Sequence, residues 1–432
     1  MVAEATGVSA IEATRLPGGL FVITEKLPYL HSVTLGFAYR VGARDDPAGR
    51  EGMAHLIEHM IFKGTDELDA KTINIIAETH GAELNGWTDK EGTCFYVRCP
   101  ADQTGVMVEL MGRILSAPAF AEAELSKEKE VVGEEIRASE EDPETCALNL
   151  LLTAVFGDAP LGRPGIGTID SISRINRADL AEFYQHHYGA EGGVVVGVGR
   201  VDHGELVKKL AALDGRRCGP APRELSVPGK PAVRTCTRAD ISQVHFCLAV
   251  PAFAYNDPRR YRLSVLNTAL GGGVSSRLFQ RLREEEGLVY SIGSFVELYE
   301  DAGLLGIYLS AEHQKLPRCW AVLNEELNRL RKERFTTAEF ERALVMNRSA
   351  VLLGMETPLN RMLRLSRGYL MLGRVQTVEE TIAGLEGVKR DEVNELIDEL
   401  FNGRGFYVSA VGPIGESEVK EIIFQKGGNN EA

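Results

Sequence analysis

Alternating or short apolar runs recur along the first half of the chain and predict β-strands. Turn-forming residues lie between these strands. The first predicted hairpin spans 14–25, and a strand follows at 32–41. A second hairpin is predicted from 83–88 and 93–99 across the turn 89–92, and a short apolar strand at 193–198.

Apolar residues at helical spacing lie between these strands. They predict helices at 53–64, 71–80, 105–115, 122–139, 177–187 and 204–213. We expect Gly64 to be the C-cap of the first helix, since glycine readily adopts the left-handed conformation that ends many helices.

The pattern repeats after a segment rich in Pro, Gly and Arg at 215–231, which we expect to be a linker. The strand and acidic helix that begin at 193 resemble those that begin at 406, an offset of 213 residues (406 minus 193). A period near half the chain indicates two copies of one domain. We therefore expect an α+β fold with two homologous domains, 1–214 and 232–432, each a mostly antiparallel sheet packed with helices.

The predicted helix 53–64 has two different faces. At about 100° per residue, four of its side chains fall within about a third of the circumference, and four aliphatic ones lie opposite. The first set is His55, Glu58, His59 and Phe62, and the second is Met53, Leu56, Ile57 and Met60. The aliphatic face suits a hydrophobic core, while the other face carries two imidazoles, a carboxylate and one aromatic ring.

Two neutral imidazoles at i and i+4 are suited to hold a zinc ion, and a carboxylate beside them can act as a general base. His55-Leu56-Ile57-Glu58-His59 has the order His-x-x-Glu-His, the inverse of the zincin motif. With nine His in 432 residues the motif arises by chance in roughly one or two of a hundred such chains, and a histidine pair can also be a surface feature. We favour the metal interpretation because aliphatic residues already occupy the opposite face.

A third ligand should come from another element, since catalytic zinc usually has three protein ligands. In the helix 122–139, Glu128 and Glu135 are two turns apart and flank the apolar side, whereas Glu134 points roughly opposite. A carboxylate beside a buried stripe is costly unless it is paired or metal-bound. Spacing alone leaves two interpretations open, a metal ligand and the charged flank of an amphipathic helix.

Composition limits the class of protein. With 44% hydrophobic and 25% charged residues the chain is ordinary for a globular protein. Its net charge of −14 argues against nucleic-acid binding. Seven scattered cysteines without Cys-x-x-Cys suit a reducing compartment. We see no signal or transit peptide and no apolar run that could span a membrane, so we expect a cytoplasmic protein.

Several motifs together resemble the pitrilysin/insulinase superfamily of zinc metallopeptidases. They lie at 55–65, 84–96 and 128–135, with further matches at 16–20 and 160–163. The half-size branch, which contains the mitochondrial processing peptidase β subunits and bacterial relatives, is more similar than the full-length one. The resemblance implies one Zn²⁺ per chain held by His55, His59 and Glu135, with Glu58 as the general base.

The resemblance also implies roles for residues outside this set. Glu128 is similar to a family carboxylate that supports catalysis. Phe62 is similar to an aromatic residue that lines the pocket for the substrate residue after the scissile bond. Arg283 and Tyr290 match residues that bind the substrate backbone and the developing oxyanion. A further implied group is the strand that pairs with an extended peptide, formed by Asn85, Gly86 and Trp87.

One departure from the family concerns specificity. Presequence-processing subunits carry acids after the third ligand that bind an Arg before the cut, and Thr145 and Asn149 occupy those positions here. The resemblance therefore does not extend to a strict preference for Arg at that position.

We expect a zinc endopeptidase that cuts extended peptides or short unfolded segments. Full-length relatives use four such domains and this chain has two, so we expect a homodimer, with a paralogous partner subunit as the other option. A non-catalytic scaffold is the alternative function, against which the intact His55, Glu58, His59 and Glu135 argue. A zinc amidase acting on small molecules is a further alternative.

Overall fold

The computed structural model describes residues 10–212, 218–220, 222–402 and 405–424. Contacts divide the chain into two units, each assembled from three stretches. Unit 1 consists of Met1–Ile136, Pro164–Glu224 and Gly354–Gln376, and unit 2 of Arg137–Arg163, Leu225–Leu353 and Thr377–Ala432. The domain limits 1–214 and 232–432 stay a prediction about the two sequence copies, and part of the predicted linker 215–231 falls outside the described residues.

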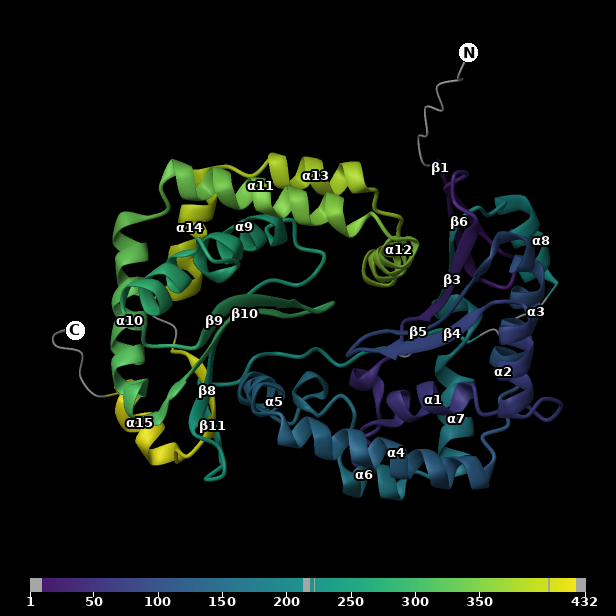
Figure 1. Ribbon diagram of the computed structural model, residues 1–432, viewed down its shortest axis with the longest axis horizontal. Coiled ribbons are helices and arrows are strands. Elements are labelled where there is room, and N and C mark those ends of the chain that lie inside the picture. The colour runs from purple at the N-terminus through teal and green to yellow at the C-terminus, as the bar shows by residue number, and fades with distance from the viewer. Residues whose placement is uncertain (1–9, 213–217, 221, 403–404, 425–432) are drawn as a thin grey trace, which may run out of the picture. The chain divides into compact units, whose positions relative to one another are not determined.

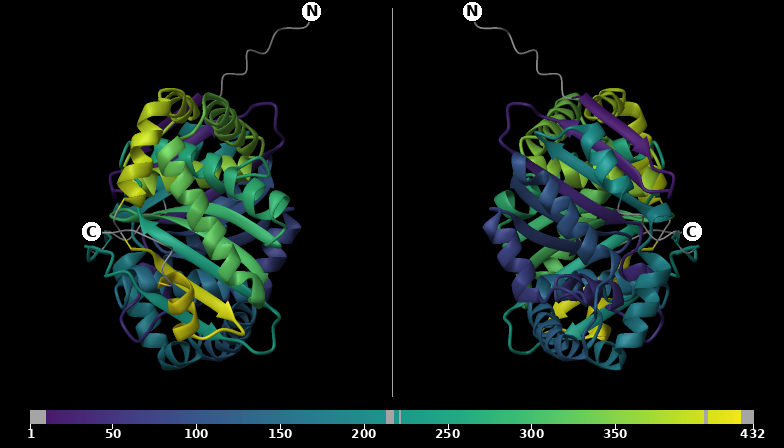
Figure 2. Two further views of the ribbon diagram at one scale, coloured as in Figure 1. Left: turned by 90° about the vertical axis from the view of Figure 1, so that its left-hand side faces the viewer. Right: turned by 90° about the vertical axis from the view of Figure 1, so that its right-hand side faces the viewer.

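Unit 1 contains a six-stranded sheet in the order β1-β2-β6-β3-β5-β4. Its strands are β1 (Ala10–Arg15), β2 (Phe21–Lys26), β3 (Ser32–Tyr39), β4 (Glu83–Thr88), β5 (Thr93–Pro100) and β6 (Gly193–Gly199). Only β2 and β6 are parallel, and both predicted hairpins are present as the antiparallel pairs β1–β2 and β4–β5. Figure 2, in its right-hand view, shows purple β1 at one edge of this sheet, and β4 forms the other edge.

Helices cover both faces of this sheet, which explains why its central strands are apolar on both sides. Val33, Leu35 and Phe37 of β3 pack with α1, α3 and α7, while Ala38 packs against α12 on the opposite face. The helices of unit 1 are α1 (Met53–Ile61), α2 (Ala70–Thr79), α3 (Thr104–Ser116), α4 (Glu122–Glu141, which runs into unit 2), α6 (Ile169–Arg174), α7 (Arg177–His187), α8 (His203–Ala211) and α12 (Pro358–Leu372).

Unit 2 contains a five-stranded sheet in the order β7-β11-β8-β10-β9. Its strands are β7 (Val233–Thr237), β8 (Gln243–Pro251), β9 (Ser291–Leu298), β10 (Gly303–Glu312) and β11 (Tyr407–Gly412). Only β7 and β11 are parallel, so the order and directions repeat those of β2-β6-β3-β5-β4. The predicted α+β class and the two homologous copies are confirmed.

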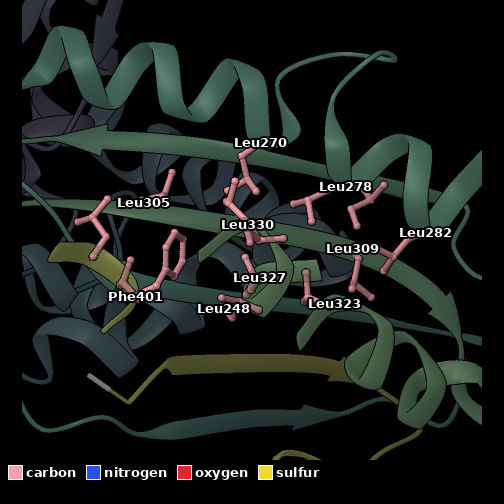
Figure 3. Packing of buried hydrophobic residues seen from close by; sticks show 14 of the residues in the cluster. Leu248, Leu270, Leu278, Leu282, Leu305, Leu309, Leu323, Leu327, Leu330 and Phe401 are labelled. Carbon is pink, nitrogen blue, oxygen red and sulfur yellow. The ribbon is translucent and has the colours of Figure 1, made fainter. Parts of the chain in front are cut away.

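The main core of unit 2 lies between one face of this sheet and helices α9, α10 and α14 (Figure 3). Leu248 of β8 and Leu305 and Leu309 of β10 project into this core because they alternate along their strands. The helices of unit 2 are α5 (Pro143–Phe156), α9 (Arg260–Gly271), α10 (Leu316–Glu333), α11 (Thr337–Gly354), α13 (Val378–Glu386), α14 (Arg390–Phe401) and α15 (Glu416–Phe424).

The second face of each sheet is covered by a helix from the other half of the sequence. Helix α5, from the first half, packs on the sheet of unit 2 through Leu151 and Val155. Helix α12, from the second half, packs on the sheet of unit 1 through Met362 and Leu365. The sequence pattern did not predict this exchange, because a helix period shows that one face is apolar and not which sheet it covers.

Short helical turns join several of these elements. They are η1 (Ala43–Asp45), η2 (Ala101–Gln103), η3 (Pro160–Gly162), η4 (Ala190–Gly192), η6 (His313–Lys315) and the π-helical η5 (Phe279–Glu285). All seven cysteines are free thiols. Among the described residues, no helix combines the length and the apolar character that a membrane crossing requires.

The predicted cap of α1 is wrong. The helix ends with Phe62 as its C-cap, two residues before Gly64. Gly64 instead adopts a φ of +131° in the turn that follows, where a Cβ would lie 2.9 Å from the carbonyl oxygen of Leu68. The glycine is therefore required by the turn and not by the helix end.

Candidate metal centre

Helix α1 buries its aliphatic face and leaves the histidine face partly exposed, as its pattern predicts. Met53, Leu56 and Ile57 are almost fully buried, whereas His55 and His59 are half-buried. The start of the helix is held by the buried carboxylate of Asp46, which accepts hydrogen bonds from the backbone N–H groups of Gly52 (2.7 Å) and Ala54 (2.9 Å). Burial raises the pKa of Asp46 well above its usual range.

His55, His59 and Glu135 come together from two helices. The distances from Oε2 of Glu135 are 3.6 Å to Nε2 of His55 and 3.5 Å to Nε2 of His59. One ligand atom from each residue lies within 4.8 Å of the other two. Across the described ranges this is the only group of three His, Cys, Asp or Glu that could hold a metal ion. The predicted set of donors is thus assembled, although its members are far apart in sequence.

The donor set fits a zinc ion. Two imidazoles and one carboxylate are a common set of protein ligands for catalytic zinc, with a fourth position left for water or substrate. Burial and, secondly, the neighbouring His59 lower the pKa of His55 to about 4, so its imidazole is neutral at neutral pH. A neutral imidazole keeps the lone pair that a metal bond requires.

Glu128 and Lys63 support the second histidine. The Nδ1 atom of His59 lies 3.1 Å from Oε2 of Glu128, and Nζ of Lys63 lies 2.6 Å from Oε1 of the same carboxylate. The side chain of Glu128 is only 7% exposed, so both its charge and its position depend on these partners. A carboxylate on Nδ1 leaves Nε2 free to bind a metal.

Lys63 was not identified from the sequence. Its position four residues after His59 was the available signal, because residues at i and i+4 share a helix face. Asp46 was also missed, and the signal there was an Asp-Pro pair shortly before the helix.

Glu58 lies against the edge strand β4. A Cβ on Gly86 would come within 2.9 Å of Cγ and 3.3 Å of Oε1 of Glu58, so only glycine allows this approach. Burial raises the pKa of Glu58, and the charge of Glu135 raises it further, while His59 lowers it. Figure 1 shows α1 between the β4–β5 pair and α4, which is the arrangement that brings these groups together.

The remaining residues predicted in unit 1 lie beside this group. Asn85 is exposed on β4, and the indole Nε1 of Trp87 is buried without a hydrogen-bond partner in the described part of the chain. Phe62 is half-buried at the end of α1, with its ring 6.1 Å from that of Phe95. Asn85 and Trp87 flank Gly86 along β4, Phe62 follows Glu58 by four residues, and the roles of all three stay predictions.

Arg283 and Tyr290 belong to unit 2. The guanidinium carbon of Arg283 lies 5.9 Å from the ring centre of Tyr290 and 5.0 Å from that of Phe279. Both predicted residues are exposed, Tyr290 to 73%. Arg283 lies in the π-helical turn η5, a conformation that is rare and frequent at functional sites. The two side chains lie beside each other, and their roles in binding substrate stay predictions.

Comparisons with known families match most of the chain. A model described as insulinase, peptidase family M16, matches residues 21–169. A second model, described as the peptidase M16 inactive domain, matches residues 174–345, a stretch that contains no His-x-x-Glu-His motif.

Bacterial relatives match nearly the full length. A protein of Mycobacterium tuberculosis named an uncharacterized zinc protease is 36% identical over 420 residues, covering 96% of this chain and 95% of the relative. A protein of the same description from Streptomyces coelicolor is 32% identical over 425 residues, covering 96% and 92%. The corresponding protein of Bacillus subtilis is 30% identical over 403 residues, covering 92% and 97%.

Solved structures share the fold. A structure described as the peptidase M16 inactive domain from Pseudomonas fluorescens has a TM-score of 0.85 at 20% identity, covering 94% of this chain and 98% of that one. A protease from Helicobacter pylori has a TM-score of 0.83 at 19% identity, covering 94% and 100%. With the relatives above, these matches confirm the predicted resemblance: the chain belongs to the insulinase family of peptidases, peptidase family M16.

Proposed function

We propose that this protein is a zinc-dependent endopeptidase that hydrolyses peptide bonds in extended peptides or short unfolded segments. The single observation that supports this most strongly is the convergence of His55, His59 and Glu135 beside a half-buried Glu58. A donor set for zinc with an adjacent carboxylate is the arrangement that metal-assisted hydrolysis requires.

The three donors would hold one zinc ion per chain. When bound, the ion would polarise the substrate carbonyl and lower the pKa of a water molecule. Glu128 and Lys63 fix the ring of His59, since the carboxylate contacts Nδ1 and the ammonium group holds the carboxylate.

Glu58 is the proposed general base. Its carboxylate accepts a proton from the attacking water and then returns it to the leaving amine, which is the usual exchange for a carboxyl group in hydrolysis. Burial favours the protonated form of Glu58, so the group is suited to holding that proton between the two steps.

The edge strand β4 is the proposed binding surface for the peptide. It pairs with β5 on one side only, so its other side can add an extended peptide as a further strand. Asn85, Gly86 and Trp87 lie on this strand, and Gly86 contacts Glu58. A peptide bound there would lie close to the general base, with Phe62 nearby at the end of α1.

Arg283 and Tyr290 are the proposed partners of the substrate carbonyl oxygen. In the described part of the chain, Arg283 has no carboxylate partner, whereas its neighbour Arg281 is paired with Glu286 at 3.0 Å. An exposed cation beside a phenol can stabilise an oxygen that gains negative charge. We propose a homodimer as the assembly, and gel filtration that gives a fully active monomer would contradict it.

Replacing Arg283 tests this role. We expect Arg283→Gln to lower kcat/KM by on the order of 100-fold, the loss typical of one oxyanion donor. The matched control is Arg281→Gln, which removes an ion-paired arginine from the same turn. Equal losses in both variants would show that the turn as a whole matters and not the free cation.

The decisive test of the function is a map of peptide cuts by mass spectrometry, with wild type compared with Glu58→Gln. We expect zinc in both proteins and cleavage on the order of 100- to 10,000-fold slower in the variant. Stoichiometric zinc without cleavage of any library peptide by wild type would favour a non-catalytic scaffold. Unchanged cleavage by Glu58→Gln would contradict the mechanism.

A further inference from the structure

The chain that leads out of unit 1 is bound tightly to that unit by Arg223. Its guanidinium forms a two-pronged pair with Asp45, with Nε donating to Oδ1 at 2.8 Å and Nη2 to Oδ2 at 2.7 Å. Nη2 also donates to the backbone carbonyl of Glu91 at 2.8 Å. The side chains of Arg223 and Asp45 are 6% and 7% exposed, so these contacts are shielded from water.

Arg223 thereby joins two segments that are attached to α1 and to β4. The first is the loop 42–46, whose last residue, Asp46, caps the start of α1. The second is the turn 89–92 between β4 and β5. Backbone hydrogen bonds from Ala43 to Asp89 (3.0 Å) and from Arg44 to Lys90 (2.8 Å) hold the loop and the turn together.

A second buried arginine strengthens the same junction. Nη1 of Arg44 donates to Oε1 of Glu91 at 2.5 Å, and both side chains are 1% exposed. Nη2 of Arg44 donates to the carbonyl of Glu224 at 2.7 Å. The segment 222–224 is therefore bound through a side chain and through its backbone, and each bond ends on the loop or the turn.

The strand attached to this turn needs such support. β4 is an edge strand, so only β5 fixes it by hydrogen bonds. It also contains Gly86, which gives its backbone extra freedom at the point of contact with Glu58. Besides its packing on α1 and α2, β4 is held at its end by the contacts of the turn, which help to set where the strand lies relative to α1.

We propose that Arg223 is a positioning residue for peptide binding. It holds the β4–β5 turn against the loop that leads into α1, and so keeps the free edge of β4 at the correct place beside Glu58. The proposal rests on the proposed peptidase function. It gives a residue of the expected linker 215–231 a part in the unit that carries the candidate site.

The side-chain chemistry explains why an arginine is suited to this position. A planar guanidinium can bind both oxygens of Asp45 and still donate to the Glu91 carbonyl, whereas a lysine has one compact ammonium group. The hydrogen bonds described above run from Arg223 to Asp45 of the loop and to the Glu91 carbonyl of the turn, so replacing it first loosens the junction between these two segments.

The test uses the full-length, zinc-loaded protein with the variants Arg223→Gln and Arg223→Lys. The matched control is Arg238→Gln, because Arg238 forms the same two-pronged pair with Asp240 at distances of 2.9 and 2.6 Å, with both side chains more exposed. Amide hydrogen exchange of 83–92 and of α1 is measured by mass spectrometry. KM and kcat are measured with a quenched extended peptide, and zinc content with the same samples.

We expect Arg223→Gln to speed exchange in 83–92 by about tenfold or more while α1 stays protected. KM should rise about tenfold with kcat within a factor of three and zinc unchanged, because ground-state binding is weakened and the chemistry is not. Arg223→Lys should have a smaller effect, since it keeps the charge, and Arg238→Gln should have none.

Two results would overturn the proposal. The first is exchange in 83–92 that is equal in Arg223→Gln and the control. The second is faster exchange throughout unit 1 with loss of zinc, which would make Arg223 a general stabilising residue. If wild type cleaves no peptide, the proposed function fails, and exchange in 83–92 still decides whether Arg223 positions β4.

Discussion

Helix α1 of unit 1 and helix α9 of unit 2 occupy equivalent places, each following the strands β3 or β8 and preceding β4 or β9. Both helices carry polar residues at i, i+3 and i+4. On α1 these are His55, Glu58 and His59, and on α9 they are Ser264, Asn267 and Thr268. Both copies therefore carry a polar face at this place, with different chemistry.

The approaching helix differs in the same way. In unit 1, α4 brings Glu135 to the two histidines, and in unit 2, α11 brings Asn347 to Ser264 and Thr268. The hydroxyl of Ser264 donates to Oδ1 of Asn347 at 2.5 Å, and Nδ2 of Asn347 donates to Oγ1 of Thr268 at 2.9 Å and to the carbonyl of Ala343 at 2.8 Å.

This difference shows that the same fold can carry two kinds of polar cluster at equivalent places. Asn347 is 9% exposed and its hydrogen bonds join the helices directly. In unit 1 the Nε2 atoms of both histidines converge on one carboxylate oxygen at 3.5 and 3.6 Å, and Glu135 is 46% exposed. Ser264 and Thr268 of unit 2 form hydrogen bonds with Asn347, whereas the polar groups of unit 1 are arranged around a shared position that a cation can fill.

The largest expected effect comes from the third ligand. Glu135→Gln should lose bound zinc and lower peptide cleavage by more than about 100-fold, because removal of a direct ligand costs more than removal of a supporting residue. Zinc content by mass spectrometry and hydrolysis of a quenched peptide measure this. Glu134→Gln, on the same helix, should keep both, and equal zinc loss in the two variants would contradict the comparison.

A smaller loss of zinc binding is expected when Lys63 is replaced. The hydrogen bonds described above for unit 2 include no lysine in a similar role. Lys63→Met leaves the buried Glu128 without its cation and should weaken zinc affinity by about tenfold. Competition with a fluorescent chelator measures the affinity. Lys127→Met removes a lysine whose partner Glu124 is on the surface, and it should leave zinc affinity unchanged.

Replacing the polar cluster of unit 2 should not change zinc binding, but it should lower the free energy of unfolding. Asn347→Ala removes hydrogen bonds to Ser264 and Thr268 and should destabilise the protein by about 1–3 kcal/mol. Zinc content and kcat/KM should not change. Denaturant unfolding measures the stability, and Asn328→Ala on the surface of α10 is the control, with an expected change within about 0.5 kcal/mol. A loss of zinc in Asn347→Ala would break the comparison.

The sequence by itself determined the features that depend on neighbours along the chain. The two faces of α1 and both hairpins of unit 1 follow from local period, since side chains alternate in strands and recur every 3.6 residues in helices. The repeat of a strand and an acidic helix at 193 and 406 is likewise visible along the chain. The pair of imidazoles at His55 and His59 belongs to this class, because residues at i and i+4 lie on the same face of a helix.

Only the tertiary structure decided which distant groups meet. Spacing left Glu135 open between ligand and charged flank, and the family resemblance, not the helix pattern, singled it out. Lys63 on Glu128, Arg223 on Asp45 and Asn347 on Ser264 join residues that lie 65, 178 and 83 positions apart. The same holds for α5, from the first half of the sequence, which covers the sheet of unit 2, and for α12, from the second half, which covers the sheet of unit 1. A local pattern indicates only that a helix or strand face is apolar or charged. Which distant residue packs against that face depends on how the whole chain folds.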